Sequence, residues 1–180
     1  SPGSSNLPSD FFLQANDAAG ASWITNETDY SGNWNQYLGK CFCWDFKVIN
    51  DGDPGTIGVH PWIMIYQGSP SAPTLAARFN ATITVDETTG WAHVCAPIDG
   101  CIAGSLPSNL NGSWTMTTGA NTCANWLALL NNVSGVQFFL DLTSSPTEVY
   151  GFDNICIKTC QECSCRSDLT LTSGNQNFPV

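Results

Sequence analysis

The chain has 180 residues, of which 11% are charged, and its formal net charge is −10. This length suffices for one domain with a sizeable core. Five basic residues against fifteen acidic ones argue against binding nucleic acid or an anionic membrane, because both need a basic surface. No run of 18 apolar residues occurs, so no membrane insertion is predicted. An acidic chain of otherwise neutral polar residues suits calcium and neutral ligands such as sugars.

Nine cysteines indicate disulfides and an oxidising compartment, so the predicted localisation is secreted or cell-surface. The odd number leaves one thiol unpaired or paired outside the chain. Cys101 and Cys123 are expected to close a long loop. The other candidate pairings join Cys160 or Cys163 to Cys41, Cys43 or Cys156. A metal site in the CxxCxC tail is the alternative for the last cysteines.

In chain order, residues 1–9 are rich in Ser, Pro and Gly and predict a linker or a remnant outside the fold. Short strands are expected over residues 10–13 and 23–25, and a polar loop over residues 26–39. Residues 40–50 carry the clearest strand, because apolar side chains from Phe42 to Val48 alternate with more polar ones.

Further strands are predicted over residues 61–67, 75–85, 91–96, 113–117, 135–142 and 148–158, with residues 124–130 as one short helix. In the last strand Asp153 and Asn154 interrupt an apolar run. A buried polar group without a partner costs about 1–3 kcal/mol, so a cation or the N–H groups of a turn should satisfy them. The tail, residues 159–180, is polar and rich in cysteine, and it either holds one edge strand at residues 169–172 or simply leads to a next domain.

These elements predict an all-β fold, a two-sheet antiparallel β-sandwich (jelly roll) with disulfide-stapled loops, over residues 10–158. Residues 159–180 are then a Cys-rich tail or a linker to a following domain. Apolar alternation requires a core between the two layers. The predicted core consists of Phe42, Trp44, Phe46, Phe79, Ile83, Trp91, Val94, Phe138, Leu140, Ile155 and Ile157.

The order of motifs resembles a known family. An Asp-Phe strand near the N-terminus precedes Trp23, a Phe/Trp alternating strand follows, TTGW stands at residues 88–91, and YGFDNICI closes the chain at residues 150–157. This order is similar to that of galactose-binding-domain-like jelly rolls, which include carbohydrate-binding modules, laminin IV-type domains and modules of large bacterial surface proteins. The Cys-rich tail has no counterpart in the simple modules.

The resemblance implies a structural calcium ion at Asp153. Asp10, Asn16 and Asp17 would complete its shell if the first and last strands lie side by side. Calcium takes about six to eight oxygen ligands, so several such residues are needed. The alternative is that Asp153 caps a turn or lies in a bulge.

Loop and strand aromatics are the candidate ligand residues. Exposed aromatic rings can stack on the apolar face of a sugar, and nearby amides supply hydrogen bonds. The amides that flank Trp34 fit this description. The candidates are Trp34, Tyr37, Trp62, Tyr66 and Trp114. The alternative is that these side chains pack in the core.

Together these observations predict a non-catalytic extracellular module that binds a glycan or polysaccharide and holds a structural calcium ion. The alternative is a structural or adhesive domain of a cell-surface protein, with other surface proteins as partners. No GxSxG motif occurs and neither His60 nor His93 stands in a catalytic motif. A small glycanase or lyase would need catalytic groups converging in one groove. Four Asn-x-Ser/Thr triplets, at Asn26, Asn80, Asn111 and Asn132, leave glycosylation open.

Overall fold

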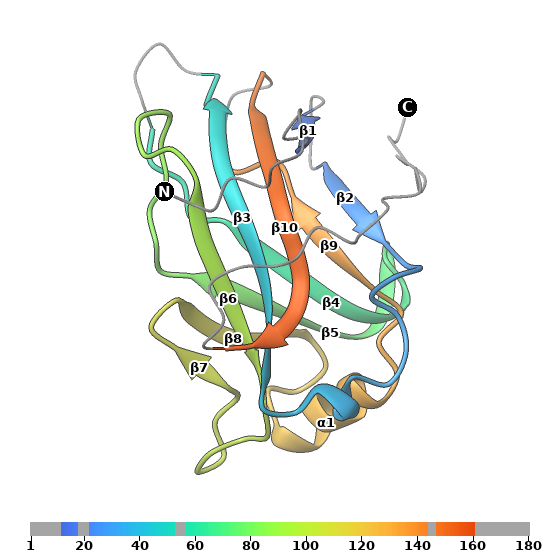
Figure 1. Cartoon of the computed structure of the whole chain (residues 1–180). Coiled ribbons are helices and arrows are strands. Elements are labelled where there is room, and N and C mark those ends of the chain that lie inside the picture. Colours follow the sequence, from blue (N-terminus) through green and yellow to red (C-terminus); the bar gives the residue numbers. More distant parts are fainter. Residues whose placement is uncertain (1–11, 18–21, 53–56, 144–146, 161–180) are drawn as a thin grey trace.

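The computed structural model describes residues 12–17, 22–52, 57–143 and 147–160, which form a sandwich of two antiparallel sheets (Figure 1). The four-stranded sheet has the order β1 (Leu13–Asn16), β10 (Val149–Thr159), β3 (Lys40–Asn50), β6 (Ala92–Ile98). The six-stranded sheet has the order β2 (Trp23–Asn26), β9 (Gly135–Phe139), β4 (Trp62–Ser69), β5 (Ala72–Ala81), β8 (Gly112–Thr118), β7 (Ser108–Asn109). The predicted fold class is confirmed.

The core lies between the sheets and is built by period-two alternation. In β3 the side chains of Phe42, Trp44 and Phe46 point inward and are fully buried. Phe42 is at the centre of an aromatic cluster. Its ring centroid lies 5.0–6.1 Å from those of Tyr30, Trp34, Trp44 and Phe138. The rest of the predicted core is buried or packs against the buried cluster, with one exception.

The exception is Trp91, whose predicted place in the core is wrong. Trp91 precedes β6 and has the opposite parity from Ala92 and Val94, which point inward. Its half-buried ring instead packs edge-on against Phe12, with centroids 5.2 Å apart. The first strand begins at Leu13, and the predicted linker, most of the Cys-rich tail and the edge strand at residues 169–172 lie outside the described residues.

Two short helices close one end of the sandwich. The helix predicted over residues 124–130 is α1 (Cys123–Asn131), capped by the Thr122 hydroxyl, which accepts a hydrogen bond from Asn125 N. It buries Trp126 and Leu129 against the core. The 3₁₀ helix η1 (Trp34–Tyr37) lies beside it (Figure 1). No helix of the described residues has the length and apolar composition needed to cross a lipid bilayer.

A disulfide joins Cys101 to Cys123, as predicted, and another joins Cys41 to Cys160, which is one of the candidate pairings. A third joins Cys43 to Cys95. The sequence did not reveal this pair because it depends on register. Cys43 and Cys95 stand directly opposite each other on β3 and β6, with Cα atoms 4.1 Å apart. Cys156 is disulfide-bonded as well.

Gly112 sits where β8 passes close to β5. A Cβ atom at this position would lie 2.1 Å from the carbonyl oxygen of Asn80, and neither backbone can retreat without breaking the strand pairing. We therefore expect Gly112→Ala to lower the free energy of unfolding by about 1–3 kcal/mol, the usual cost of overpacking. Gly100→Ala is the matched control, because a Cβ there meets no atom within 4 Å. Equal urea midpoints for the two variants would contradict the expectation.

Candidate functional site

One face of the six-stranded sheet lines the core, and we call the opposite one the outer face. Strand register arranges its side chains in rows that run across five strands. The first row contains Trp23, Phe139, Trp62, Asn80 and Ser113. The second row contains Thr25, Gln137, Met64, Arg78 and Thr115. Aromatic side chains therefore lie beside neutral polar ones, and Arg78 is the single charged residue in these two rows.

The first row is centred on a stack of two half-buried rings. Trp62 and Phe139 are nearly parallel, with an interplanar angle of 21° and ring centroids 4.2 Å apart. The Arg78 guanidinium lies 5.0 Å from the centre of the Trp62 ring. Such a cation–π contact contributes about 0.5–1 kcal/mol at an exposed site, so it helps to hold Arg78 in place.

The second row contains two hydrogen-bond donors without a partner among the described residues. They are Nε2 of Gln137, a side chain that is only 4% exposed, and Nε of Arg78. A buried donor without an acceptor costs about 1–3 kcal/mol. Met64 lies between the two residues in the register and is half-buried.

Tyr66 stands at the end of this face on β4 and is fully buried. Its hydroxyl donates a hydrogen bond to Oε1 of Glu27 at 2.8 Å. Burial, and then the neighbouring Glu27 carboxylate, raise the pKa of Tyr66 far above its ordinary value. The hydroxyl therefore stays protonated and acts as an anchor for the loop that follows β2.

The five predicted ligand aromatics do not come together. Trp34 and Trp114 are buried in the core, with their indole N–H groups donating to Tyr30 O and Pro97 O. Tyr37 is half-buried in η1, 5.7 Å from the Lys40 ammonium group. Trp62 and Tyr66 lie on the outer face, and of these two only Trp62 is accessible. Trp34 itself therefore offers no open ring, because its indole packs against Phe42.

The residues that sequence reasoning missed on the outer face are Trp23, Arg78, Gln137 and Phe139. For two of them, the sequence does contain a signal that assigns them to this face. Apolar alternation in β9 places Val136 and Phe138 inward, which assigns Gln137 and Phe139 to the other face. Which strands lie next to one another, and so which side chains meet, depends on the pairing of β4 with β5 and β9.

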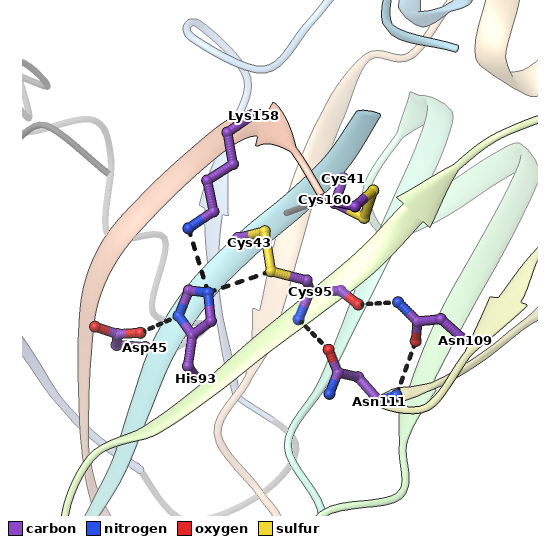
Figure 2. The surroundings of a disulfide bond; sticks show 9 residues. All are labelled: Cys41, Cys43, Asp45, His93, Cys95, Asn109, Asn111, Lys158 and Cys160. Carbon is purple, nitrogen blue, oxygen red and sulfur yellow. Dashed lines mark hydrogen bonds and ion pairs between the residues drawn. A yellow bond between two sulfur atoms is a disulfide. The ribbon is translucent and has the colours of Figure 1, made fainter. Parts of the chain in front are cut away.

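A second polar cluster lies on the outer surface of the four-stranded sheet (Figure 2). The Asp45 carboxylate pairs with Nδ1 of His93 at 2.5 Å and accepts a hydrogen bond from Asn154 Nδ2 at 2.6 Å. Nε2 of His93 faces Sγ of Cys95 and Nζ of Lys158, each at 3.3 Å. Sγ of Cys95 cannot serve this Asp-His pair as a thiol nucleophile, because Cys95 is bonded to Cys43. The same disulfide removes the thiolates that a metal site at Cys43, His93 and Cys95 would require.

The predicted calcium ligands separate into two places. Asp17 is buried, and one of its carboxylate oxygens lies within 4.8 Å of oxygens from Asp141 and Glu148. Asn16 is exposed at the end of β1, and Asp10 lies outside the described residues. Asp153 is five residues beyond Glu148 along β10, roughly 16 Å at the usual strand rise, and so too far to share an ion with Asp17.

Asp153 instead stands at a bulge in β10. The register shifts between Asp153 and Cys156, and Asn154 has a φ of +50°. Oδ1 of Asp153 accepts a hydrogen bond from the backbone N–H of Asn154 at 2.7 Å. Asn is among the residues that best tolerate this conformation. The structure thus places Asp153 in the bulge that the sequence offered as the alternative to a calcium site.

Comparison with known proteins adds little. No family model matches the chain, and no curated protein matches it. Among solved structures, the L4b domain of human laminin alpha-2 aligns with a TM-score of 0.46 and 8% sequence identity. The alignment covers 74% of this chain and 67% of that one.

Proposed function

We propose that this chain is a non-catalytic extracellular module that binds a neutral glycan on the outer face of the six-stranded sheet. The observation that carries the proposal is the half-exposed Trp62–Phe139 stack with Arg78 beside it, bordered by hydroxyl and amide side chains. Sugars combine apolar C–H surfaces with many hydroxyls, and such a surface supplies counterparts to both. The disulfides support an oxidising, extracellular location.

The chemistry of the second row favours a ligand rich in hydroxyl groups. Gln137 Nε2 and Arg78 Nε are donors that lack acceptors among the described residues, and a sugar hydroxyl accepts hydrogen bonds. Asn80, Ser113 and Thr115 add both donors and acceptors in the same two rows. A glycan that reached this row would thus supply acceptors to buried donors that have none among the described residues.

The test is affinity electrophoresis through gels that contain neutral soluble polysaccharides, with Trp62→Ala compared with the wild type. We expect at least one polysaccharide to retard the wild-type chain, and Trp62→Ala to weaken binding about tenfold or more, or about 1.4 kcal/mol. Trp91→Ala is the matched control, because Trp91 is a half-buried tryptophan at the other sheet. Urea unfolding of each variant checks that the fold is retained. Unchanged retardation of Trp62→Ala would sink the proposal.

A protein ligand on the same face is the second candidate, and one observation favours it. Trp, Phe, Met and Arg are enriched at protein interfaces, and the centre of the outer face consists of Trp62, Phe139, Met64 and Arg78. The module would then be a structural or adhesive domain of a cell-surface protein. Absence of retardation by every polysaccharide, with Trp62→Ala still folded, would favour this candidate over a glycan.

A further inference from the structure

Three carboxylates meet where β1 and β9 end and β10 begins. Asp17 directly follows β1, Asp141 lies two residues after β9, and Glu148 directly precedes β10. One carboxylate oxygen from each lies within 4.8 Å of the other two. Asp17 is 8% exposed and Glu148 is completely buried. Ionised carboxylates are seldom buried in such a group without a proton or a cation between them.

Glu148 is the residue that points to a ligand. Its Oε1 accepts hydrogen bonds from the Thr143 N–H and the Tyr150 hydroxyl, both at 2.5 Å. Its Oε2 is buried and has no hydrogen-bond partner among the described residues. The two donors fix the orientation of the carboxylate through Oε1, so Oε2 keeps a lone pair that none of the described residues satisfies. A buried carboxylate oxygen in this position needs a counter-charge or a proton.

The electrostatics around Tyr150 reflect the same concentration of negative charge. Burial raises the pKa of Tyr150 most, and the carboxylates around its hydroxyl raise it further. Those carboxylates belong to Glu148, Asp17 and Asp51. Burial also raises the pKa of Glu148, although its hydrogen bonds from Tyr150 and Thr143 act in the opposite direction.

We propose that Asp17, Asp141 and Glu148 bind a calcium ion that ties the two sheets together. Calcium–oxygen distances are about 2.3–2.6 Å, so two ligands of one ion can be up to roughly 5 Å apart, as these oxygens are. All three groups are hard oxygen donors, which calcium prefers. β1 and β10 belong to the four-stranded sheet and β9 to the six-stranded one, so the ion would clasp both layers.

The local hydrogen bonds preorganise this site. The Ser22 hydroxyl donates to Oδ1 of Asp17, and the Asp17 N–H donates to the Glu148 carbonyl at 2.8 Å. The Leu140 N–H donates to the carbonyl of Ser22 at 2.9 Å. Segments that carry the three carboxylates are thus already joined to one another. The rival explanation for Glu148 is a proton on its carboxyl group, which would need no metal.

Calcium alone is the probe, measured by titration calorimetry and by thermal unfolding in excess calcium or excess chelator. At about one hundred times its Kd, calcium should raise the melting temperature of the wild-type chain by roughly 5–10 °C. Glu148→Gln and Asp141→Asn should each abolish the binding heat and most of this shift. Asp99→Asn is the control, because Asp99 is an exposed acid in the loop after β6 and should leave both readouts unchanged.

Three results would overturn the proposal. One is a wild-type chain with no binding heat and the same melting temperature in calcium and chelator. Another is a calcium shift that persists in both variants, which would place the ion elsewhere. The third is a Glu148→Gln chain that is stabilised while the wild type ignores calcium, as a protonated Glu148 predicts. If Glu148→Gln does not fold, Asp141→Asn decides, since Asp141 is only half-buried.

Discussion

Replacing Phe42 with alanine is expected to lower the free energy of unfolding by about 3–5 kcal/mol, the range found when a buried Phe becomes Ala. The Phe42 side chain is completely buried and touches aromatic rings from both sheets. Its removal leaves a cavity that rigid rings cannot fill by small shifts, and each ring loses contacts. The measurement is the urea midpoint, followed by tryptophan fluorescence, with m-values compared to verify two-state unfolding.

Phe42→Leu is the control for this prediction. It keeps most of the buried apolar volume, so it should cost clearly less than Phe42→Ala. Equal losses for the two variants would mean that ring geometry rather than cavity volume decides the stability. A loss below about 1 kcal/mol for Phe42→Ala would contradict the role of Phe42 at the centre of the core.

The second large effect concerns the disulfide between Cys41 and Cys160, whose sequence separation is 119. In the chain-entropy model a loop of this length contributes about 5 kcal/mol to stability, against about 3 kcal/mol for a loop like that closed by Cys101 and Cys123. The double variant Cys41→Ser, Cys160→Ser should therefore be destabilised by several kcal/mol. Urea unfolding of this variant and the wild type, both under oxidising conditions, measures the loss.

The matched control is Cys101→Ser with Cys123→Ser, because that disulfide has a sequence separation of only 22. The chain-entropy model predicts that removing the bridge that closes the long loop lowers the free energy of unfolding more than removing the bridge that closes the short loop. If the order is reversed, the stabilising effect of these bridges does not come from restricting the unfolded chain.

The sheet core was predictable from the sequence because period-two alternation alone determines it. β3 was predicted with the observed bounds, since Phe42, Trp44 and Phe46 alternate with Cys41 and Cys43. Trp91 shows the limit of this reasoning. Whether an aromatic residue just outside a strand points inward depends on where the strand begins, and a one-residue difference reverses the face.

The candidate site was far less predictable. Polar neighbours in the sequence made Trp34 look exposed, yet the chain turns at η1 and packs the indole on Phe42. Conversely, the outer-face row joins Phe139 on β9 to Trp62 on β4, far apart in the sequence. The acidic cluster was equally hard to predict, because Asp17, Asp141 and Glu148 meet only when the fold brings three strand ends together. Each of these contacts depends on strand register and on the path of the connecting loops, and no local sequence pattern encodes either.

The most direct test of the central proposal is to map a bound oligosaccharide by NMR on the isotopically labelled chain. The fragment comes from whichever neutral polysaccharide retards the chain. Glycan binding on the outer face predicts shifts of the Trp62 indole N–H and of the side-chain amides of Asn80 and Gln137, with the Trp34 indole unmoved. Shifts confined to the loop around Trp34 and Tyr37, or no shifts with any fragment tested, would contradict it.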